Sequence, residues 1–336
     1  MILVTGGTGF VGSHLLFDLA KSGEKVRAIH RKNSDLEAVK KVFSYYTDEK
    51  NAEELFNSIE WTEADITEIP ALTSAFENIT RVYHCAAFVS MGAGHEKVMR
   101  RVNIKGTANV VNLCIKEKIE KLCYVSSVAS LGKPVKGKII EEDNLWNPEE
   151  NHSDYAITKY GAEIEVWRGS QEGLDVVIVN PGVILGAGFW NEGSSRAFTR
   201  IDKGLKFYFP KVTGFVGVRD VVKAMKLLMA SDIKNEKYIL VAENLSFKKL
   251  FSKIADSINR PRPSRLIKKW MIKIAWVLQR LGAPFGVKQQ FTRHSASTLY
   301  EDARYSSEKI RNELDFQFTP IAEVISETGK IYRKEH

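Results

Sequence analysis

The feature that most limits the fold is an alternation of short β-rich runs with longer helical patterns through the first two-thirds of the chain. The runs expected to form strands are 2–5, 25–29, 59–65, 81–87, 121–127 and 174–181. The stretches expected to form helices are 10–21, 52–56, 70–78, 96–117 and 155–170. Successive βαβ units of this kind predict an α/β protein whose doubly wound parallel sheet carries helices on both faces.

The pattern loosens after residue 181. Glycine and aromatic residues crowd the stretch 182–198, and proline and arginine interrupt the stretch 259–265. We therefore predict two domains. The first consists of residues 1–181 together with about 213–241, and the smaller second domain consists of residues 182–212 and 242–336.

The composition is that of a globular protein without a disulfide framework. The chain has 336 residues, of which 44% are hydrophobic, and a net charge of +8, which permits several kinds of anionic partner without choosing among them. Cys85, Cys114 and Cys123 lie in apolar stretches without metal-ligand spacing, so we expect buried thiols in a reducing compartment. We expect a cytoplasmic protein, because no signal peptide and no apolar run of membrane-spanning length is found.

Glycines follow the first apolar run directly. Gly6, Gly9 and Gly12 stand three residues apart, and the stretch from Gly7 through Phe10 and Val11 to Gly12 also matches the G-x-G-x-x-G pattern. Residues without a Cβ let the backbone approach a pyrophosphate, and the following helix N-terminus supplies free N–H groups. A strand before the glycines and a helix after them is the context that a dinucleotide site requires. The alternative is a tight turn with a purely structural role.

The end of the second expected strand indicates which dinucleotide is bound. An acidic residue about 20 positions after the glycines would accept the ribose 2′-hydroxyl of NAD(H). This chain instead has His30, Arg31 and Lys32 there, and Asp35 lies further along. A guanidinium fork suits a 2′-phosphate, so we predict NADP(H) as the preferred cofactor, with NAD(H) possible. The alternative is that these charges are only solvated.

Three further residues complete a recognisable set. Ser127 ends the fifth expected strand, and Tyr155 and Lys159 stand four apart near the start of a helical stretch, which places them on one helix face. With the glycine fingerprint, this set resembles the extended short-chain dehydrogenase/reductase superfamily, which includes nucleotide-sugar epimerases and dihydroflavonol reductases. The resemblance extends over nearly the whole chain. It implies a Rossmann fold whose first domain binds NAD(P) and whose smaller C-terminal domain binds the substrate.

The resemblance implies a role for each matching residue. Tyr155 would give or take the proton at the substrate oxygen, Lys159 would bond the nicotinamide ribose and lower the tyrosine pKa, and Ser127 would hold the substrate oxygen. Ser126 is the close competitor of Ser127, and Asn103 matches a helix asparagine with a structural or water-relay role. The remaining cofactor contacts implied are Asp65 and Ile66 beside the adenine, Ala86 and Ala87 beside the ribose, and Pro181, Gly182 and Val183 beside the nicotinamide.

Residues around this set favour one branch. Val128 and Ala129 replace the acidic residues that sugar dehydratases carry, and Asp154 replaces the proline that usually precedes the tyrosine in epimerases. Trp146 and a preceding glutamate resemble the dihydroflavonol 4-reductase branch. The resemblance thus implies an NADPH-dependent reductase of a ketone or aldehyde. A nucleotide-sugar epimerase with tightly bound NAD and a non-catalytic cofactor-binding protein are the alternatives.

The predicted substrate is a small carbonyl compound in a largely apolar pocket. Its candidate contacts are Met91, His95, Leu131, Lys133, Phe189, Trp190 and Phe215, and ordinary packing is the more common role for such side chains. The stretch 264–282 carries an apolar stripe, and we favour packing over the cleft to contact with a membrane surface. The helices 95–117 and 155–170 could form a homodimer contact. No pattern typical of a metal site or of nucleic-acid binding appears.

Overall fold

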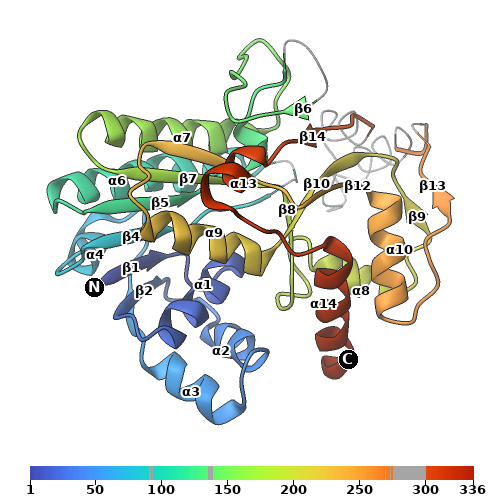
Figure 1. Cartoon of the computed structure of the whole chain (residues 1–336), viewed down its shortest axis with the longest axis horizontal. Helices are drawn as coiled ribbons and strands as arrows, with labels where there is room; N and C mark the ends of the chain where they lie inside the picture. The colour runs from blue at the N-terminus through green and yellow to red at the C-terminus, as the bar shows by residue number, and fades with distance from the viewer. Residues whose placement is uncertain (91, 93, 135–138, 269, 273, 275–299) are drawn as a thin grey trace.

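A computed structural model describes residues 1–336 except 91, 93, 135–138, 269, 273 and 275–299. Its main sheet has seven strands, all parallel, in the order β11-β7-β5-β4-β1-β2-β3 (Figure 1). The strands are β1 (Ile2–Thr5), β2 (Val26–His30), β3 (Glu60–Glu63), β4 (Arg81–His84), β5 (Lys121–Val125), β7 (Val176–Pro181) and β11 (Glu236–Leu240). The strand order reverses direction between β1 and β4, which is where doubly wound sheets bind ligands. The predicted fold class is confirmed.

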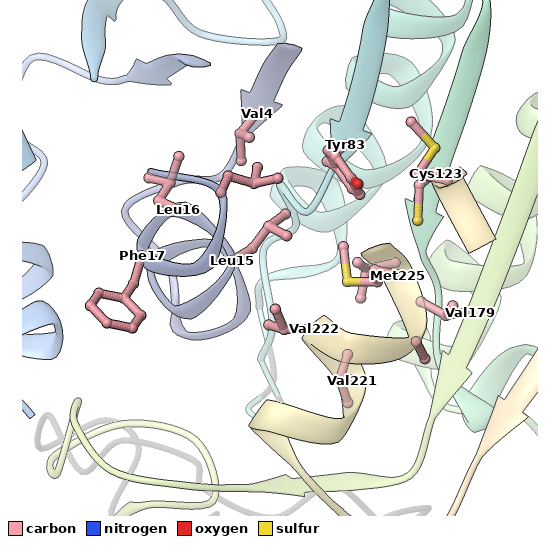
Figure 2. Packing of buried hydrophobic residues seen from close by; sticks show 14 of the residues in the cluster. Val4, Leu15, Leu16, Phe17, Tyr83, Cys123, Val179, Val221, Val222 and Met225 are labelled. Carbon is pink, nitrogen blue, oxygen red and sulfur yellow. The ribbon is translucent and has the colours of Figure 1, made fainter. Parts of the chain in front are cut away.

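Both faces of this sheet are buried. Neighbouring residues of a strand point to opposite sides, so a single strand contributes side chains to the cores on both faces. In β5, Cys123 belongs to a first apolar core on one face, and Leu122 and Tyr124 belong to a second core on the opposite face. The first core lies under α1 (Phe10–Lys21) and α9 (Val218–Ala230), whose Leu15 and Met225 Figure 2 shows against the sheet. Helices α2 (Leu36–Ser44), α3 (Glu49–Asn57) and α13 (Glu308–Leu314) also contribute to this first core.

The opposite core lies under α4 (Ile69–Ala75), α6 (Thr107–Lys116) and α7 (Asp154–Gln171). The single helix expected over 96–117 is divided. A short α5 (Glu96–Met99) is followed by a π-helical turn, η1 (Arg100–Gly106), and then by α6. The π turn contains Asn103, and such turns are frequent at functional sites.

A smaller layered region lies beside the main sheet (Figure 1). Its sheet has the order β12-β10-β8, with β8 (Val183–Leu185) parallel and β12 (Glu243–Ser246) antiparallel to β10 (Val212–Gly217). Helices α8 (Arg196–Asp202), α10 (Phe247–Ser257) and α14 (Ile321–Glu335) share its core. Among the described residues there are also two short strand pairs, β9 (Phe207–Tyr208) with β13 (Arg265–Leu266) and β6 (Ile139–Ile140) with β14 (Arg304–Tyr305).

The segment 213–241 is shared between the two layers. Strand β10 pairs within the small sheet, whereas β11 pairs with β7 in the main sheet and α9 packs on that sheet. The two-domain division stays a prediction. The helix expected over 264–282 is wrong at its start, where Arg265–Leu266 form strand β13 and pair with β9, and most of its remainder lies outside the described residues.

The three cysteines are free, with Cys114 and Cys123 buried and Cys85 partly buried. Within the described ranges, no helix has the length and apolar character needed to cross a membrane.

Candidate active site

The predicted cofactor and catalytic residues gather at one edge of the main sheet. Each of them, apart from the helix residues, stands at or just after the carboxyl end of a strand, and parallel strands end at the same edge. The residues concerned are Gly6 after β1, Arg31 after β2, Asp65 after β3, Ala86 after β4, Ser127 after β5 and Pro181 at the end of β7. The sheet therefore places residues that are up to 175 positions apart in sequence along one line.

The glycine turn fits closely between β1 and α1. Gly6 has φ +70, and a Cβ there would lie 2.5 Å from the backbone nitrogen of Ala86. A Cβ on Gly12 would overlap the carbonyl oxygen of Gly6. Glycine is therefore required at both positions, at Gly6 by conformation and at both by close backbone contact. The turn touches the end of β4 across the point where the strand order reverses.

The N-terminus of α1 has the properties of an anion site. Its N-cap is Gly9, which provides no side-chain hydrogen bond, and no acidic residue occupies the first turn. A Cβ on Gly9 would meet only the Gly6 carbonyl oxygen, at 3.3 Å. The free N–H groups and the positive end of the helix dipole suit a pyrophosphate, so the residues present fit a dinucleotide. Phe10 and Val11, which follow, are partly buried.

At the end of β2 the basic residues are accessible. Arg31 and Lys32 are exposed and His30 is partly buried, with its ring 6.1 Å from that of Trp61. Asp35 is occupied, because its carboxylate accepts a hydrogen bond from the backbone N–H of Ala38 as the N-cap of α2. The acid that follows this strand end in sequence thus has a structural role. Exposed Arg31 and Lys32 stand beside the exposed Glu63, which pairs with His30 across β2 and β3.

The residues expected beside the adenine and ribose are also near this edge. Asp65 accepts hydrogen bonds from the backbone N–H and the hydroxyl of Thr67, both at 2.8 Å, and Ile66 is buried. Ala86 is partly buried and Ala87 is exposed. Val183 begins β8 directly beyond Pro181 and Gly182, so these three residues join the two sheets.

Tyr155 and Ser127 face each other across this edge. Tyr155 lies in the first turn of α7 and is partly buried, and Ser127 precedes the short 3₁₀ turn η2 (Val128–Ser130). Burial raises the pKa of the Tyr155 phenol, and the nearby Ser127 side chain opposes that rise. The hydroxyl of Ser127 also accepts from the backbone N–H of Ala129 at 3.1 Å. The phenol is therefore neutral at pH 7.

Lys159 lies one helical turn after Tyr155 and is 2% exposed. Its Nζ donates to the carbonyl oxygen of Val125 at 2.7 Å and to the hydroxyl of Tyr124 at 3.2 Å. Burial lowers the pKa of Lys159 to about 8, while the charge of Glu163 acts in the opposite direction. The ammonium is thus fixed against the end of β5 and close to its titration point.

Asn103 connects three segments around the site. Its side chain accepts from the backbone N–H of Phe88 at 2.7 Å and donates to the carbonyl oxygen of Phe88 at 3.0 Å and to the hydroxyl of Thr158 at 3.1 Å. Thr158 directly precedes Lys159. Asn103 therefore ties the π turn to the segment after β4 and to α7, and in this structure its amide is fully engaged in positioning them.

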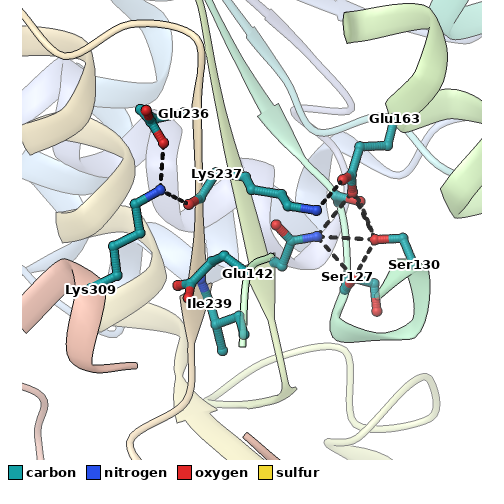
Figure 3. Close-up of polar contacts among 10 residues, drawn as sticks. Ser127, Ser130, Glu142, Glu163, Glu236, Lys237, Ile239 and Lys309 are labelled. Carbon is teal, nitrogen blue, oxygen red and sulfur yellow. Dashed lines mark hydrogen bonds and ion pairs between the residues drawn. The ribbon is translucent and has the colours of Figure 1, made fainter. Parts of the chain in front are cut away.

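Sequence reasoning missed a buried polar cluster behind Ser127 (Figure 3). The Oε2 atom of Glu163 accepts from the hydroxyls of Ser126 and Ser130, both at 2.7 Å, and from the amide of Asn180 at 3.0 Å. Ser126, the competitor of Ser127, is thus turned toward Glu163. A charged residue four positions after Lys159 was the available signal, because that spacing places it on the same buried face.

The candidate substrate contacts divide into two groups. Leu131, Trp190 and Phe215 are buried in apolar cores, as the packing alternative predicts, and Trp190 also donates to Glu335 at 2.7 Å. His95 is exposed just before α5, and Lys133 forms an ion pair with Glu150 at 3.3 Å.

Two aromatic side chains lie in positions that the sequence did not specify. Phe189 has φ +54 and its ring meets that of Phe10 edge-on at 6.2 Å, beside the glycine turn. Trp146 stacks on His152 at 3.6 Å and on Tyr160 at 4.5 Å, near the start of α7. Met91 lies outside the described residues.

Several known proteins resemble the chain over most of its length. It is 29% identical to "Sterol demethylase protein B" of Methylococcus capsulatus, over 93% of this chain and 92% of that protein. It is 28% identical to the "Putative dihydroflavonol 4-reductase" of Synechocystis, over 89% and 86% of the two chains. It is 31% identical to "Tetraketide alpha-pyrone reductase 2" of Arabidopsis thaliana, over 68% and 73%.

Solved structures share the fold. The crystal structure of gox2253 has a TM-score of 0.81 at 25% identity, covering 100% of this chain and 98% of that one. The UDP-glucose 4-epimerase of Thermus thermophilus in complex with NAD has a TM-score of 0.75 at 21% identity, covering 99% and 98%.

The model of the "NAD dependent epimerase/dehydratase family" matches residues 2–241. That range contains the glycine turn, the Ser127, Tyr155 and Lys159 set, and all seven strands of the main sheet. The chain therefore belongs to this family, and it is an NAD(P)-dependent enzyme of the extended short-chain dehydrogenase/reductase type.

Proposed function

We propose that the protein is an NADPH-dependent reductase of a ketone or aldehyde, in which Tyr155 is the general acid. The observation that carries the proposal is the placement of Ser127 just after β5 and of Tyr155 and Lys159 one turn apart on α7, with Lys159 bonded to the Val125 carbonyl oxygen, at the sheet edge that also holds the glycine turn. Relatives named as a putative dihydroflavonol 4-reductase and a tetraketide alpha-pyrone reductase support a carbonyl substrate.

The protonation states suit reduction. Reduction of a carbonyl group requires a proton at the developing alkoxide, and a neutral phenol is already the correct acid. Burial raises the pKa of Tyr155, which keeps the phenol protonated at pH 7. Ser127 offers a second hydrogen bond to the same oxygen, and the two groups together hold the carbonyl and stabilise the charge that develops on it.

Lys159 and Asn103 organise the site around Tyr155. The Lys159 ammonium is held by Val125 and Tyr124, and its positive charge favours a negatively charged group nearby. When bound, the nicotinamide ring supplies the hydride. The residues that would hold the cofactor are the glycine turn at its pyrophosphate, Asp65 and Ala86 at its adenosine half and Val183 near its nicotinamide.

A preference for NADP(H) follows from the charges at the end of β2. Arg31 and Lys32 are exposed there, and Asp35 caps α2 instead of facing a ribose. A guanidinium forms paired hydrogen bonds with a phosphate, whereas a ribose 2′-hydroxyl needs an acceptor. The relatives named as a putative dihydroflavonol 4-reductase and a tetraketide alpha-pyrone reductase support a substrate with apolar substituents.

The homodimer through α5, η1, α6 and α7 stays a prediction.

The test is turnover of a panel of aldehydes, ketones and sugar nucleotides with NADPH and with NADH. We expect reduction of a carbonyl compound with NADPH preferred. Replacing Tyr155 by Phe should lower turnover by about 10²–10⁴-fold, as loss of a general acid does, and leave NADPH binding unchanged. A Y155F variant with undiminished turnover would contradict the role of the phenol.

Purified protein that arrives with bound NAD and interconverts sugar nucleotides would favour the epimerase alternative. The matched control is Tyr160→Phe, which removes a phenol from the same helix without touching Ser127. As the control for Tyr155→Phe, the Tyr160→Phe variant should retain the full carbonyl turnover of the wild-type protein.

A further inference from the structure

Glu163 is a buried carboxylate that the mechanism above does not use. It lies four residues after Lys159 on α7, and the two side chains are 3% and 2% exposed. Residues at this spacing lie on one helix face, so the carboxylate and the ammonium are neighbours in the protein interior.

The same strand end binds both side chains. Lys159 donates to the carbonyl oxygen of Val125, and the next residue, Ser126, donates to Glu163 at 2.7 Å. The carboxyl end of β5 therefore fixes the position of the ammonium and of the carboxylate together.

Glu163 also holds the loop that carries Ser127. Its Oε2 atom accepts from Ser130 at 2.7 Å and from the Asn180 amide at 3.0 Å. The Asn180 amide in turn donates to the carbonyl oxygen of Ser127 at 3.1 Å. One oxygen atom thus links β7 and η2 to the backbone of the candidate catalytic serine (Figure 3).

The buried charge of Glu163 has two cationic neighbours. Besides Lys159, the Nζ of Lys237 on β11 lies 3.6 Å from its Oε1 atom. Lys237 is 23% exposed at its side chain and lines a cavity of about 450 Å³ at the outer edge of the sheet. A buried carboxylate requires such partners, because an unpaired charge in the interior is costly.

We propose that Glu163 is a positioning residue of the candidate active site, which holds the Ser127 loop by hydrogen bonds and keeps Lys159 charged at neutral pH. This inference rests on the proposed function for the roles of Ser127 and Lys159. Glu163 touches neither substrate nor cofactor in this scheme, and it acts through the two residues beside it.

The titratable groups around Lys159 come from three elements. They are Glu163 and Tyr155 on α7, His84 and Cys85 at the end of β4, and Tyr124 on β5. Burial lowers the pKa of His84 to about 3 and raises that of Cys85 to about 12, so neither is charged near pH 8. Glu163 is then the neighbouring charge that favours the ammonium.

The test measures unfolding of the cofactor-free protein by urea between pH 6 and 9.5. The pKa of Lys159 is about 8 in the folded state and about 10.4 when unfolded, so the folded state gains stability as pH rises through this interval. Without the Glu163 carboxylate, the pKa of Lys159 in the folded state falls further. The rise in folding stability with pH then begins at a lower pH. We expect Glu163→Gln to disfavour folding about tenfold more at pH 6 than at pH 9.5, since one pKa unit corresponds to a factor of ten.

Two controls separate this coupling from a general structural effect. In a Lys159→Met background the effect of Glu163→Gln should not change with pH, because the ammonium is absent. Glu165→Gln changes the same residue type on the same helix, at a site paired with Arg168, and should leave the pH dependence as in wild type.

A Glu163→Gln penalty that does not vary with pH, or that varies equally without Lys159, overturns the proposal. If Glu163→Gln does not fold, Lys237→Met decides. Lys237 and Lys159 share the Glu163 carboxylate, so removal of Lys237 should raise the pKa of Lys159 and move the pH at which stability begins to rise upward. If that pH stays the same or falls, the proposal is overturned. This experiment measures unfolding and not activity. Absence of carbonyl turnover in the wild-type protein would therefore contradict the proposed function without affecting the outcome of this test.

Discussion

The main sheet and the small sheet differ in how their residues come together. In the main sheet, the candidate cofactor residues outside the helices lie at or just after the carboxyl ends of parallel strands, so the strand order aligns them at one edge. In the small region, the core joins Leu185, Phe215, Leu250 and Ile321, which come from four separate segments. The candidate cofactor site therefore rests on a regular repeat of strands, whereas the small region is held together by long-range packing.

The two regions meet at a buried histidine. His14 on α1 bonds the carbonyl oxygen of Ala187 at 3.1 Å and the hydroxyl of Tyr46 at 2.8 Å. Burial lowers the pKa of His14 to about 3, so the ring is neutral and can donate at one nitrogen and accept at the other. Four changes test whether the regions are as separable as this comparison suggests.

The largest effect is expected from Phe198→Ala in the small region. Phe198 is 1% exposed and packs against Trp190 and Tyr332. Loss of a buried phenyl ring costs about 3–5 kcal/mol of unfolding free energy. Urea denaturation should show this loss, while calorimetric titration gives an NADPH affinity within about twofold of wild type. Loss of cofactor binding in the folded variant would show that the regions are coupled.

Gly12→Ala should have the next largest effect, on the main sheet region. The new methyl group would overlap the Gly6 carbonyl oxygen, and forcing it in costs about 3 kcal/mol. NADPH affinity should fall about 100-fold by titration of cofactor fluorescence. Gly23→Ala is the control, because its Cβ would meet no atom within 4 Å and the backbone strain at its φ of +73 lies beyond the opposite end of α1. Equal affinities in the two variants would mean that the turn does not form the cofactor site.

Acid should weaken the contact between the regions. A histidine with a pKa of about 3 when folded and about 6.5 when unfolded loses stability as pH falls below 6.5, by about 1.4 kcal/mol per pH unit. Between pH 6.5 and 5 this amounts to about 2 kcal/mol for His14. His14→Gln keeps polar groups but does not titrate, so its unfolding free energy should fall less over this interval. Identical pH slopes would exclude His14 as the acid-sensitive group.

The smallest effect is expected from Arg31→Ala, which changes cofactor choice alone. A hydrogen bond to a charged phosphate contributes about 1.5 kcal/mol or more, so NADPH binding should weaken about tenfold. NADH binding should be unchanged, because its ribose carries no phosphate there. Binding of both cofactors can be measured by titration. A parallel loss for both would indicate that Arg31 contacts a part that they share.

Strong local patterns made much of this protein predictable. The helix Phe10–Lys21 and the strand Ile2–Thr5 have the predicted bounds, because a glycine turn separates two clear periodicities. The helix expected over 96–117 was wrong at its centre, where Asn103 bonds Phe88 and Thr158 within a π turn. Those partners are 15 and 55 residues away, and no local pattern reports them.

The sequence predicts the candidate catalytic set but not the contacts that hold it in place. The spacing of Tyr155 and Lys159 follows from the helical period alone. That Ser126 turns toward Glu163 while Ser127 faces Tyr155 depends on α7 packing against the end of β5. Sequence reasoning could leave only an open choice between the two serines, because they are adjacent and identical.

The sequence by itself determined the parallel sheet, the glycine turn and the helical pairing of phenol and amine, since each follows from backbone geometry over a few residues. Only the tertiary structure decided which buried groups are charged and what surrounds them. Burial sets the pKa of Lys159 and of His14, and long-range hydrogen bonds set the partners of Glu163. Both arise when segments distant in sequence exclude water together.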